Sequence, residues 1–144
     1  MMYSYYNPIE AINYLKQICK KRKEGYTKAA EMIKIPELEK LFIKFAKQSD
    51  DFEYELLHYS DQKHANAAVF DSYRLRGWQN FYDELDEITL ERILAICEKK
   101  EKETIGDYEE TLEETLPEEI EQVINRQLIE ITDAYDTIIG IKTR

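Results

Sequence analysis

The chain has 144 residues, of which 43% are hydrophobic and 35% charged, with only four glycines and three prolines. This length fits one domain that folds without needing a metal or a disulfide, and the abundance of Glu, Lys, Leu and Ile favours an all-α protein. The formal charge of −10 repels phosphate groups and therefore argues against nucleic acid or an anionic membrane surface as a partner.

The first helix is predicted over about residues 8–34. Asn7, Pro8 and Glu10 form its start, with Asn as the N-cap, Pro at the first helical position and Glu at the capping-box position. After this start, core-like residues recur at alternating spacings of three and four and form one stripe along the helix. The stripe positions are 12, 15, 19, 22, 26, 29 and 33.

The second helix is predicted over 36–60 and is followed by a long crossover over 61–86. Ile35 precedes Pro36, which favours an extended backbone and a sharp reversal between the first two helices. The stripe of the second helix is at 38, 42, 45, 49, 52, 56 and 59. The crossover is rich in aromatic residues, and we expect it to contain a short helix that lies across the bundle.

The third and fourth helices are predicted over 87–114 and 117–142. Their stripes are at 90, 94, 97, 101, 104, 108 and 112, and at 120, 124, 127, 131, 134, 138 and 141. Four helices of about 25 residues with sustained stripes predict a left-handed four-helix bundle over residues 1–144 as a single domain. Two antiparallel hairpins joined by the long crossover would have ferritin-like topology, with the second and third helices parallel.

The compartment is predicted from the cysteines and from the hydropathy of the chain. Cys19 and Cys97 lie within helical stripes, where an intracellular thiol behaves as a small hydrophobic residue; a redox or metal-binding thiol is the alternative. No stretch approaches the roughly 18 apolar residues of a membrane span, and the first ten residues do not resemble a signal peptide. We therefore predict a cytoplasmic protein with no membrane partner.

Several stretches carry a family resemblance. They are CKKRKEGYTKAAE, PELEKLF, RGWQNFYDELD, AICEKKE, and LPEEIEQVINRQ through AYDTI, and they fall along nearly the whole chain. Together they resemble a bacterial family of ferritin-like four-helix-bundle proteins of unknown function. The resemblance implies a ferritin-like bundle and, by analogy with the superfamily, metal binding, but it implies no established activity.

A di-iron site in such a bundle needs one Glu from each of two helices and a Glu-x-x-His pair from each of the other two. Glu55 and His58 form one such pair, but the chain has no histidine after His64. Pairing at equal height across the first turn places Glu55 level with Lys16, not with Glu24. His58 falls near the surface of its helix. The sequence therefore predicts no conventional di-iron site.

Five polar residues occupy stripe positions where Leu or Ile would be expected: Arg22, Ser49, Glu101, Thr104 and Gln127. Pairing at equal height across the two turns places Arg22 level with Ser49, Gln127 level with Thr104, and Glu101 level with Glu130. Because an isolated buried charge is costly, we expect Arg22 and Glu101 to meet each other or to share hydrogen bonds with Gln127 and the stripe tyrosines. The group is interpreted as a network that fixes helix register. The alternatives are a small polar pocket for an ion or ligand, and a set of side chains that water reaches.

The leading functional prediction is a non-enzymatic helical bundle with no cofactor and a structural or protein-interaction role. It would act through a protein partner or as a homo-oligomer, for which off-stripe residues such as Ile43, Leu57 and Ile139 leave room. The alternative is a ferritin-like oxidoreductase or metal-binding protein that holds iron or another divalent metal in a degenerate site. Its candidate ligands are Glu55, His58, Glu101 and Glu130. A small-ligand carrier built around the polar stripe residues is a third interpretation.

Overall fold

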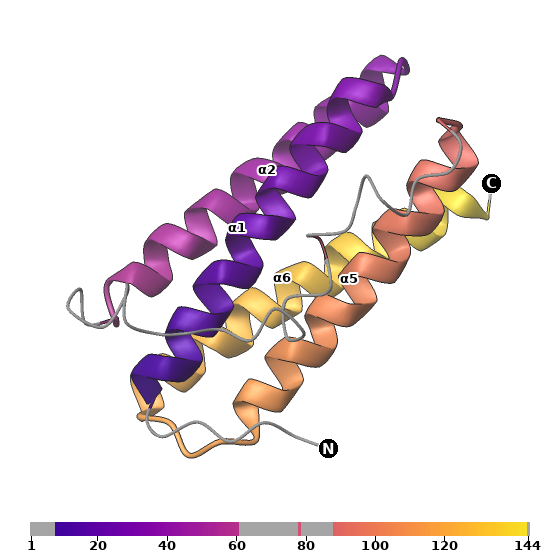
Figure 1. Cartoon of the computed structure of the whole chain (residues 1–144). Coiled ribbons are helices and arrows are strands. Elements are labelled where there is room, and N and C mark those ends of the chain that lie inside the picture. Colours follow the sequence, from indigo (N-terminus) through magenta and orange to yellow (C-terminus); the bar gives the residue numbers. More distant parts are fainter. Residues whose placement is uncertain (1–7, 61–77, 79–87, 144) are drawn as a thin grey trace.

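The fold is described by a computed structural model that covers residues 8–60, 78 and 88–143 (Figure 1). Its four α-helices are α1 (Pro8–Met32), α2 (Pro36–Leu57), α5 (Leu90–Leu112) and α6 (Glu118–Lys142). The described ranges contain no strand, so the prediction of an all-α four-helix bundle is confirmed. Within these ranges, no helix combines the length and the hydropathy that a membrane crossing requires. The aromatic helix predicted within 61–86 lies outside the described residues, except for Trp78.

The helix ends follow local sequence signals. Ile35, which precedes Pro36, has an extended backbone with φ −110° and ψ 112°, and α2 begins at the proline. The Thr89 side chain caps α5 by accepting a hydrogen bond from the backbone N–H of Arg92 at 3.2 Å. Compared with the prediction, α2 ends three residues earlier and α5 begins three residues later.

The four helices form two antiparallel hairpins, α1 with α2 and α5 with α6, which lie side by side (Figure 1). Contacts between the hairpins fix their relative direction. Arg22 of α1 contacts Glu101 of α5, whereas the earlier α1 residue Tyr14 donates to the later α5 residue Asp107 at 2.9 Å. Since these partners run in opposite order, α1 and α5 are antiparallel, and α2 and α5 therefore run in the same direction.

The core follows the predicted stripes. Every stripe residue of the four helices is buried or half-buried. The hydrophobic residues form two clusters, one around Tyr26 and Phe42 and the other around Leu15 and Tyr108. Along α1, α2 and α5, the polar stripe residues fall between the parts that contribute to the two clusters. A polar layer therefore divides the hydrophobic core near the middle of the bundle.

Trp78 fills a socket on the α1/α5 side of the bundle. A Cβ atom added to Gly25 would lie 2.1 Å from Cε3 of the indole, so only glycine leaves the space that this ring occupies. The indole lies 4.5 Å from the Tyr26 ring, centroid to centroid, and its N–H donates to Thr104 Oγ1 at 3.1 Å. Thr104 in turn donates to the carbonyl of Lys100 at 2.9 Å. The Trp78 side chain is thereby fixed between α1 and α5.

Candidate functional site

The first part of the candidate site is the Arg22 cluster, which comprises Arg22, Tyr26, Gln48, Ser49 and Glu101. Arg22 and Glu101 form a bidentate ion pair: Nε donates to Oε1 at 2.8 Å and Nη2 donates to Oε2 at 2.9 Å. The guanidinium also donates to Ser49 Oγ at 2.6 Å and to Gln48 Oε1 at 2.8 Å. This pair joins α1 to α5, and its further hydrogen bonds reach α2.

Burial makes this pairing necessary. Arg22 and Glu101 are both 0% exposed, and a buried charge without a partner would cost several kcal/mol. Burial acts to lower the pKa of Arg22, but the neighbouring Glu101 carboxylate more than offsets this effect and raises it. The guanidinium carbon also lies 5.2 Å from the centroid of the Tyr26 ring, a favourable cation–π distance. The Arg22 cluster is therefore a closed ion pair that is shielded from solvent.

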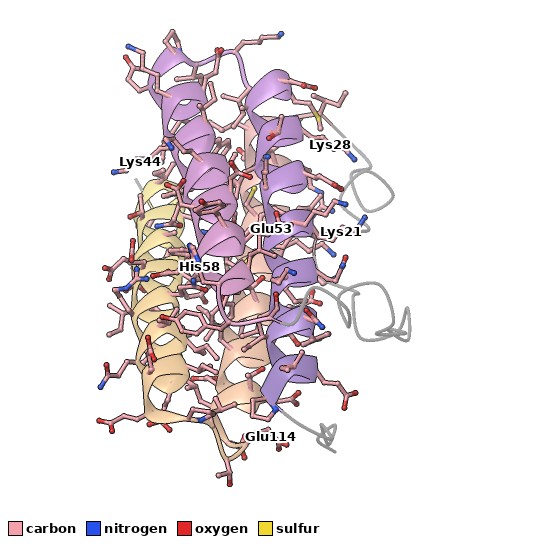
Figure 2. All side chains as sticks on the ribbon, turned by 90° about the vertical axis from the view of Figure 1, so that its left-hand side faces the viewer. Lys21, Lys28, Lys44, Glu53, His58 and Glu114 are labelled. Atoms are coloured by element: carbon pink, nitrogen blue, oxygen red, sulfur yellow. The ribbon has the colours of Figure 1, made fainter. Side chains whose placement is uncertain are left out.

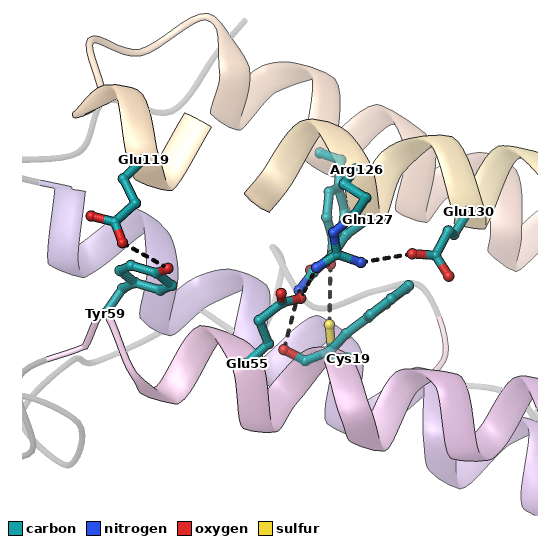
Figure 3. A network of polar contacts seen from close by, with 9 residues as sticks. Cys19, Glu55, Tyr59, Glu119, Arg126, Gln127 and Glu130 are labelled. Atoms are coloured by element: carbon teal, nitrogen blue, oxygen red, sulfur yellow. Dashed lines mark hydrogen bonds and ion pairs between the residues drawn. The ribbon is translucent and has the colours of Figure 1, made fainter. Parts of the chain in front are cut away.

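The second part is the Tyr108 chain, a run of hydrogen bonds that links Cys19, Tyr108, Gln127, Glu55 and Arg126 across all four helices (Figure 3). Tyr108 donates its only proton to Gln127 Oε1 at 2.6 Å. The Cys19 thiol, 3.2 Å from the Tyr108 oxygen, is therefore the donor in that contact. The Tyr108 chain thus begins at the buried thiol of Cys19.

Gln127 is the central member of the Tyr108 chain. Its amide oxygen accepts from Tyr108, and its amide nitrogen donates to the Phe52 carbonyl at 3.3 Å and to Glu55 Oε1 at 2.9 Å. These contacts use both amide hydrogens and the carbonyl oxygen, although the side chain is 0% exposed. Gln127 therefore ties α6 to both α5 and α2.

The outer end of the Tyr108 chain reaches the surface between α2 and α6. Arg126 pairs with Glu55 and also donates to Glu130 at 2.7 Å (Figure 3). An open groove of about 770 Å³ is lined there by residues of both helices. The groove-lining residues are Lys44, Lys47, Gln48, Asp51, Phe52, Tyr54, Glu55, His58, Arg126 and Glu130. Both signs of charge occur along it.

The buried thiols are protonated at neutral pH. Burial raises the pKa of Cys19 to about 12, although the Tyr108 hydrogen bond and Arg22 act to lower it. Burial also raises the pKa of Cys97 well above its ordinary value. Because the thiolate is the nucleophile and the metal ligand, neither side chain is prepared for covalent chemistry or for metal binding in this state.

The structure divides the five predicted polar residues among three sets of contacts. Arg22, Ser49 and Glu101 meet in the Arg22 cluster. Gln127 belongs to the Tyr108 chain and Thr104 binds Trp78. All five are buried, with exposures of 2% or less. The sequence pattern contained no signal for Gln48 or Arg126, since both lie off the stripes.

Three of the four candidate metal ligands, Glu55, His58 and Glu130, line the groove between α2 and α6, whereas Glu101 lies in the core. Glu101 is bound by Arg22, and Glu55 accepts from Arg126 and Gln127. His58 is exposed and packs edge-on against Tyr54 with the ring centroids 5.3 Å apart. Within residues 8–60, 78 and 88–143, no three side chains of the His, Cys, Asp and Glu types are placed to hold a metal ion. These residues do not fit a di-iron centre.

The fold and the contacts define an all-helical four-helix bundle with a polar layer inside its core. Residues 7–114 match a family described as a domain of unknown function, DUF2383. Since the match covers three quarters of the chain, the protein belongs to this family. The matched segment includes α1, α2 and α5, whereas α6 lies beyond it. No curated protein matches the chain.

Proposed function

We propose that this protein is a non-catalytic, cytoplasmic helical bundle that acts through contacts with protein surfaces. The observation that carries the proposal is the bidentate pairing of Arg22 with Glu101. Glu101 is the one fully buried carboxylate among the described residues, and both of its oxygens accept hydrogen bonds from Arg22. A carboxylate used in this way fixes helix register and is not offered to a metal or a substrate.

A ferritin-like topology is part of the proposal. It is supported by the two antiparallel hairpins and by the common direction of α2 and α5 (Figure 1). A connection between parallel helices must traverse the length of the bundle, and about 30 residues separate the end of α2 from the start of α5. A ferritin-like topology does not by itself imply iron chemistry, because function depends on the site and not on the topology.

The competing function is metal binding or oxidoreductase activity at Glu55, His58, Glu101 and Glu130. To bind a metal there, Glu55 and Glu130 would have to exchange their contacts with Arg126, and Glu101 would have to leave Arg22 unpaired in the core. The last change would leave a buried guanidinium charge without its counter-ion, at a cost of several kcal/mol. The contacts in the structure therefore favour the interaction role.

Metal analysis tests the proposal. Protein purified without chelator should contain far less than one metal ion per chain, and anaerobic titration with Fe²⁺ should give no stoichiometric binding. In metal content, the variants Glu55→Gln and Glu101→Gln should match the parent protein and Glu109→Gln, a control at an exposed position of α5. Stoichiometric iron that is lost in Glu55→Gln or Glu101→Gln but kept in Glu109→Gln would overturn the proposed function.

A further inference from the structure

The outward side of α2 is a ridge that no described helix covers. This α2 ridge consists of exposed residues opposite the core stripe: Lys40, Ile43, Lys47, Asp51, Tyr54 and His58. Ile43 is 53% exposed and Tyr54 is 66% exposed, and both belong to residue types that proteins bury at interfaces. We propose that the α2 ridge is the interface of a two-fold homodimer in which the α2 helices of two copies pack antiparallel.

The order of residues along the ridge makes it complementary to itself. In an antiparallel pair of α2 helices centred at the height of Ser49, Lys47 and Asp51 are each two residues from the centre. Lys47 of one copy therefore faces Asp51 of the other. Ile43 and Tyr54, six and five residues from the centre, bring apolar surfaces together. A surface that pairs basic with acidic and apolar with aromatic residues in this way suits an isologous contact.

The ends of the ridge continue the same pattern. Lys40 and His58 both lie nine residues from Ser49, so Lys40 of one copy would face the Tyr54 and His58 rings of the other. A lysine over an aromatic face is a favourable contact. Lys47 and Asp51 already pair within one helix at 3.4 Å, so the two-fold contact would assemble four charges of alternating sign.

Figure 2 looks onto the α2 side of the bundle and shows Lys44 and His58 on the side of α2 that faces α6, with Glu53 nearer α1. The groove between α2 and α6 includes four of the ridge residues, Lys47, Asp51, Tyr54 and His58, in its lining. On α6, Ile129 is 62% exposed. These neighbouring surfaces would extend the contact beyond one helix. A single ridge with this flank corresponds to an interface at the small end of the specific range, with micromolar affinity.

The charge distribution explains why a second copy would use this face. Residues 8–60 carry ten basic and nine acidic side chains, whereas residues 88–143 carry six basic and fifteen acidic side chains. Contact through α2 joins two nearly neutral hairpins and keeps the two acidic hairpins apart. Contact through α5 and α6 would instead bring two strongly negative surfaces together, which like-charge repulsion opposes.

A charge-exchange experiment tests the proposal, with sedimentation equilibrium as the measurement. The full-length protein should dimerise at concentrations of about 10 to 100 µM. Lys47→Glu places an acid against Asp51 of the other copy, and Asp51→Lys places a base against Lys47 of the other copy. Each variant alone should weaken dimerisation at least about 10-fold. An equimolar mixture of the two should form a heterodimer, because each like-charged pair then meets its opposite.

Two further variants separate the interface from folding. Ile43→Ser should weaken the dimer, whereas Ile88→Ser, at a site that is 70% exposed and outside the α2 ridge, should not. Circular dichroism melting should show that every variant remains folded. A monomeric parent protein, equal effects of Ile43→Ser and Ile88→Ser, or a mixture that stays monomeric would each overturn the dimer.

This inference rests on the proposed function, since it names the partner of an interaction protein, but the two fail differently. A folded monomer that binds no iron would remove the dimer and leave the interaction role to a different protein partner. Stoichiometric iron at Glu55 or Glu101 would overturn the interaction role whether or not the chain dimerises.

Discussion

The Arg22 cluster and the Tyr108 chain begin only three residues apart on α1, yet they end in different places. The Arg22 cluster closes on itself, with both charges fully buried. The Tyr108 chain starts at buried Cys19 and passes outward to Arg126, which is exposed between α2 and α6. Water cannot replace a lost partner in a closed, buried ion pair. Water can replace a lost partner at the outer members of the Tyr108 chain, because they are exposed. Stability should therefore be most sensitive to substitution in the cluster and should become less sensitive outward along the chain.

The largest effect is expected when one charge of the Arg22 cluster is removed. Arg22→Met leaves Glu101 buried without its cation and should lower the free energy of unfolding by about 3 to 5 kcal/mol. The double variant Arg22→Met/Glu101→Leu removes both charges and should recover most of this loss. Urea denaturation of Arg22→Met, Glu101→Leu and the double variant measures the coupling energy between the two side chains. A loss below about 1 kcal/mol in Arg22→Met would show that water reaches the pair.

A smaller effect, graded with depth, is expected along the Tyr108 chain. Gln127→Ala leaves the Tyr108 hydroxyl and the Phe52 carbonyl without their buried partner and should cost about 1 to 3 kcal/mol. Arg126→Ala removes only exposed ion pairs and should cost less than about 1 kcal/mol. Urea denaturation again gives both values. Equal losses in the two variants would contradict the distinction between the inner and outer ends.

The last effect concerns alkaline pH. The folded state keeps the Cys19 proton because its pKa is raised from 9.0 to about 12, whereas the unfolded thiol loses its proton near pH 9. The contribution to stability is therefore complete below pH 9 and declines as the pH rises above 9, by roughly 1 kcal/mol per pH unit for this thiol. Thermal denaturation between pH 8 and 10 measures the decline, and Cys19→Ala should make it less steep. A stability that does not change over this range would show that the thiol is not buried.

Periodicity predicted the helices and their buried faces well, because a residue's position on a helix depends mainly on its own spacing. The rule that antiparallel partners pair at equal height across a turn placed Arg22 beside Ser49 for the first turn. These side chains are hydrogen-bonded at 2.6 Å. The same rule for the second turn placed Gln127 beside Thr104, whereas Gln127 binds Tyr108, one turn farther along α5. A long amide side chain can reach a neighbouring turn, and a rule based on backbone height does not include that reach.

The sequence predicted the contact of Arg22 with Glu101 between the hairpins, but it did not predict the partners of Glu130 and Trp78. Glu130 was expected at the height of Glu101, but it lies at the edge of α6 and pairs with Arg126. Which face of one hairpin meets the other depends on packing across the whole bundle and not on spacing within a helix. Trp78 was recognised only as an aromatic crossover residue, because no periodic signal connects it with Gly25 or Thr104.

The fit between Gly25 and the Trp78 ring has an evolutionary consequence. Two positions 53 residues apart in the sequence share one volume, so neither can change independently. A side chain at position 25 should be tolerated only in relatives that carry a smaller residue at position 78, and such a pair of changes should be acceptable together although each alone is disruptive. Covariation of this pair would connect the crossover to α1 in any relative that shares the socket.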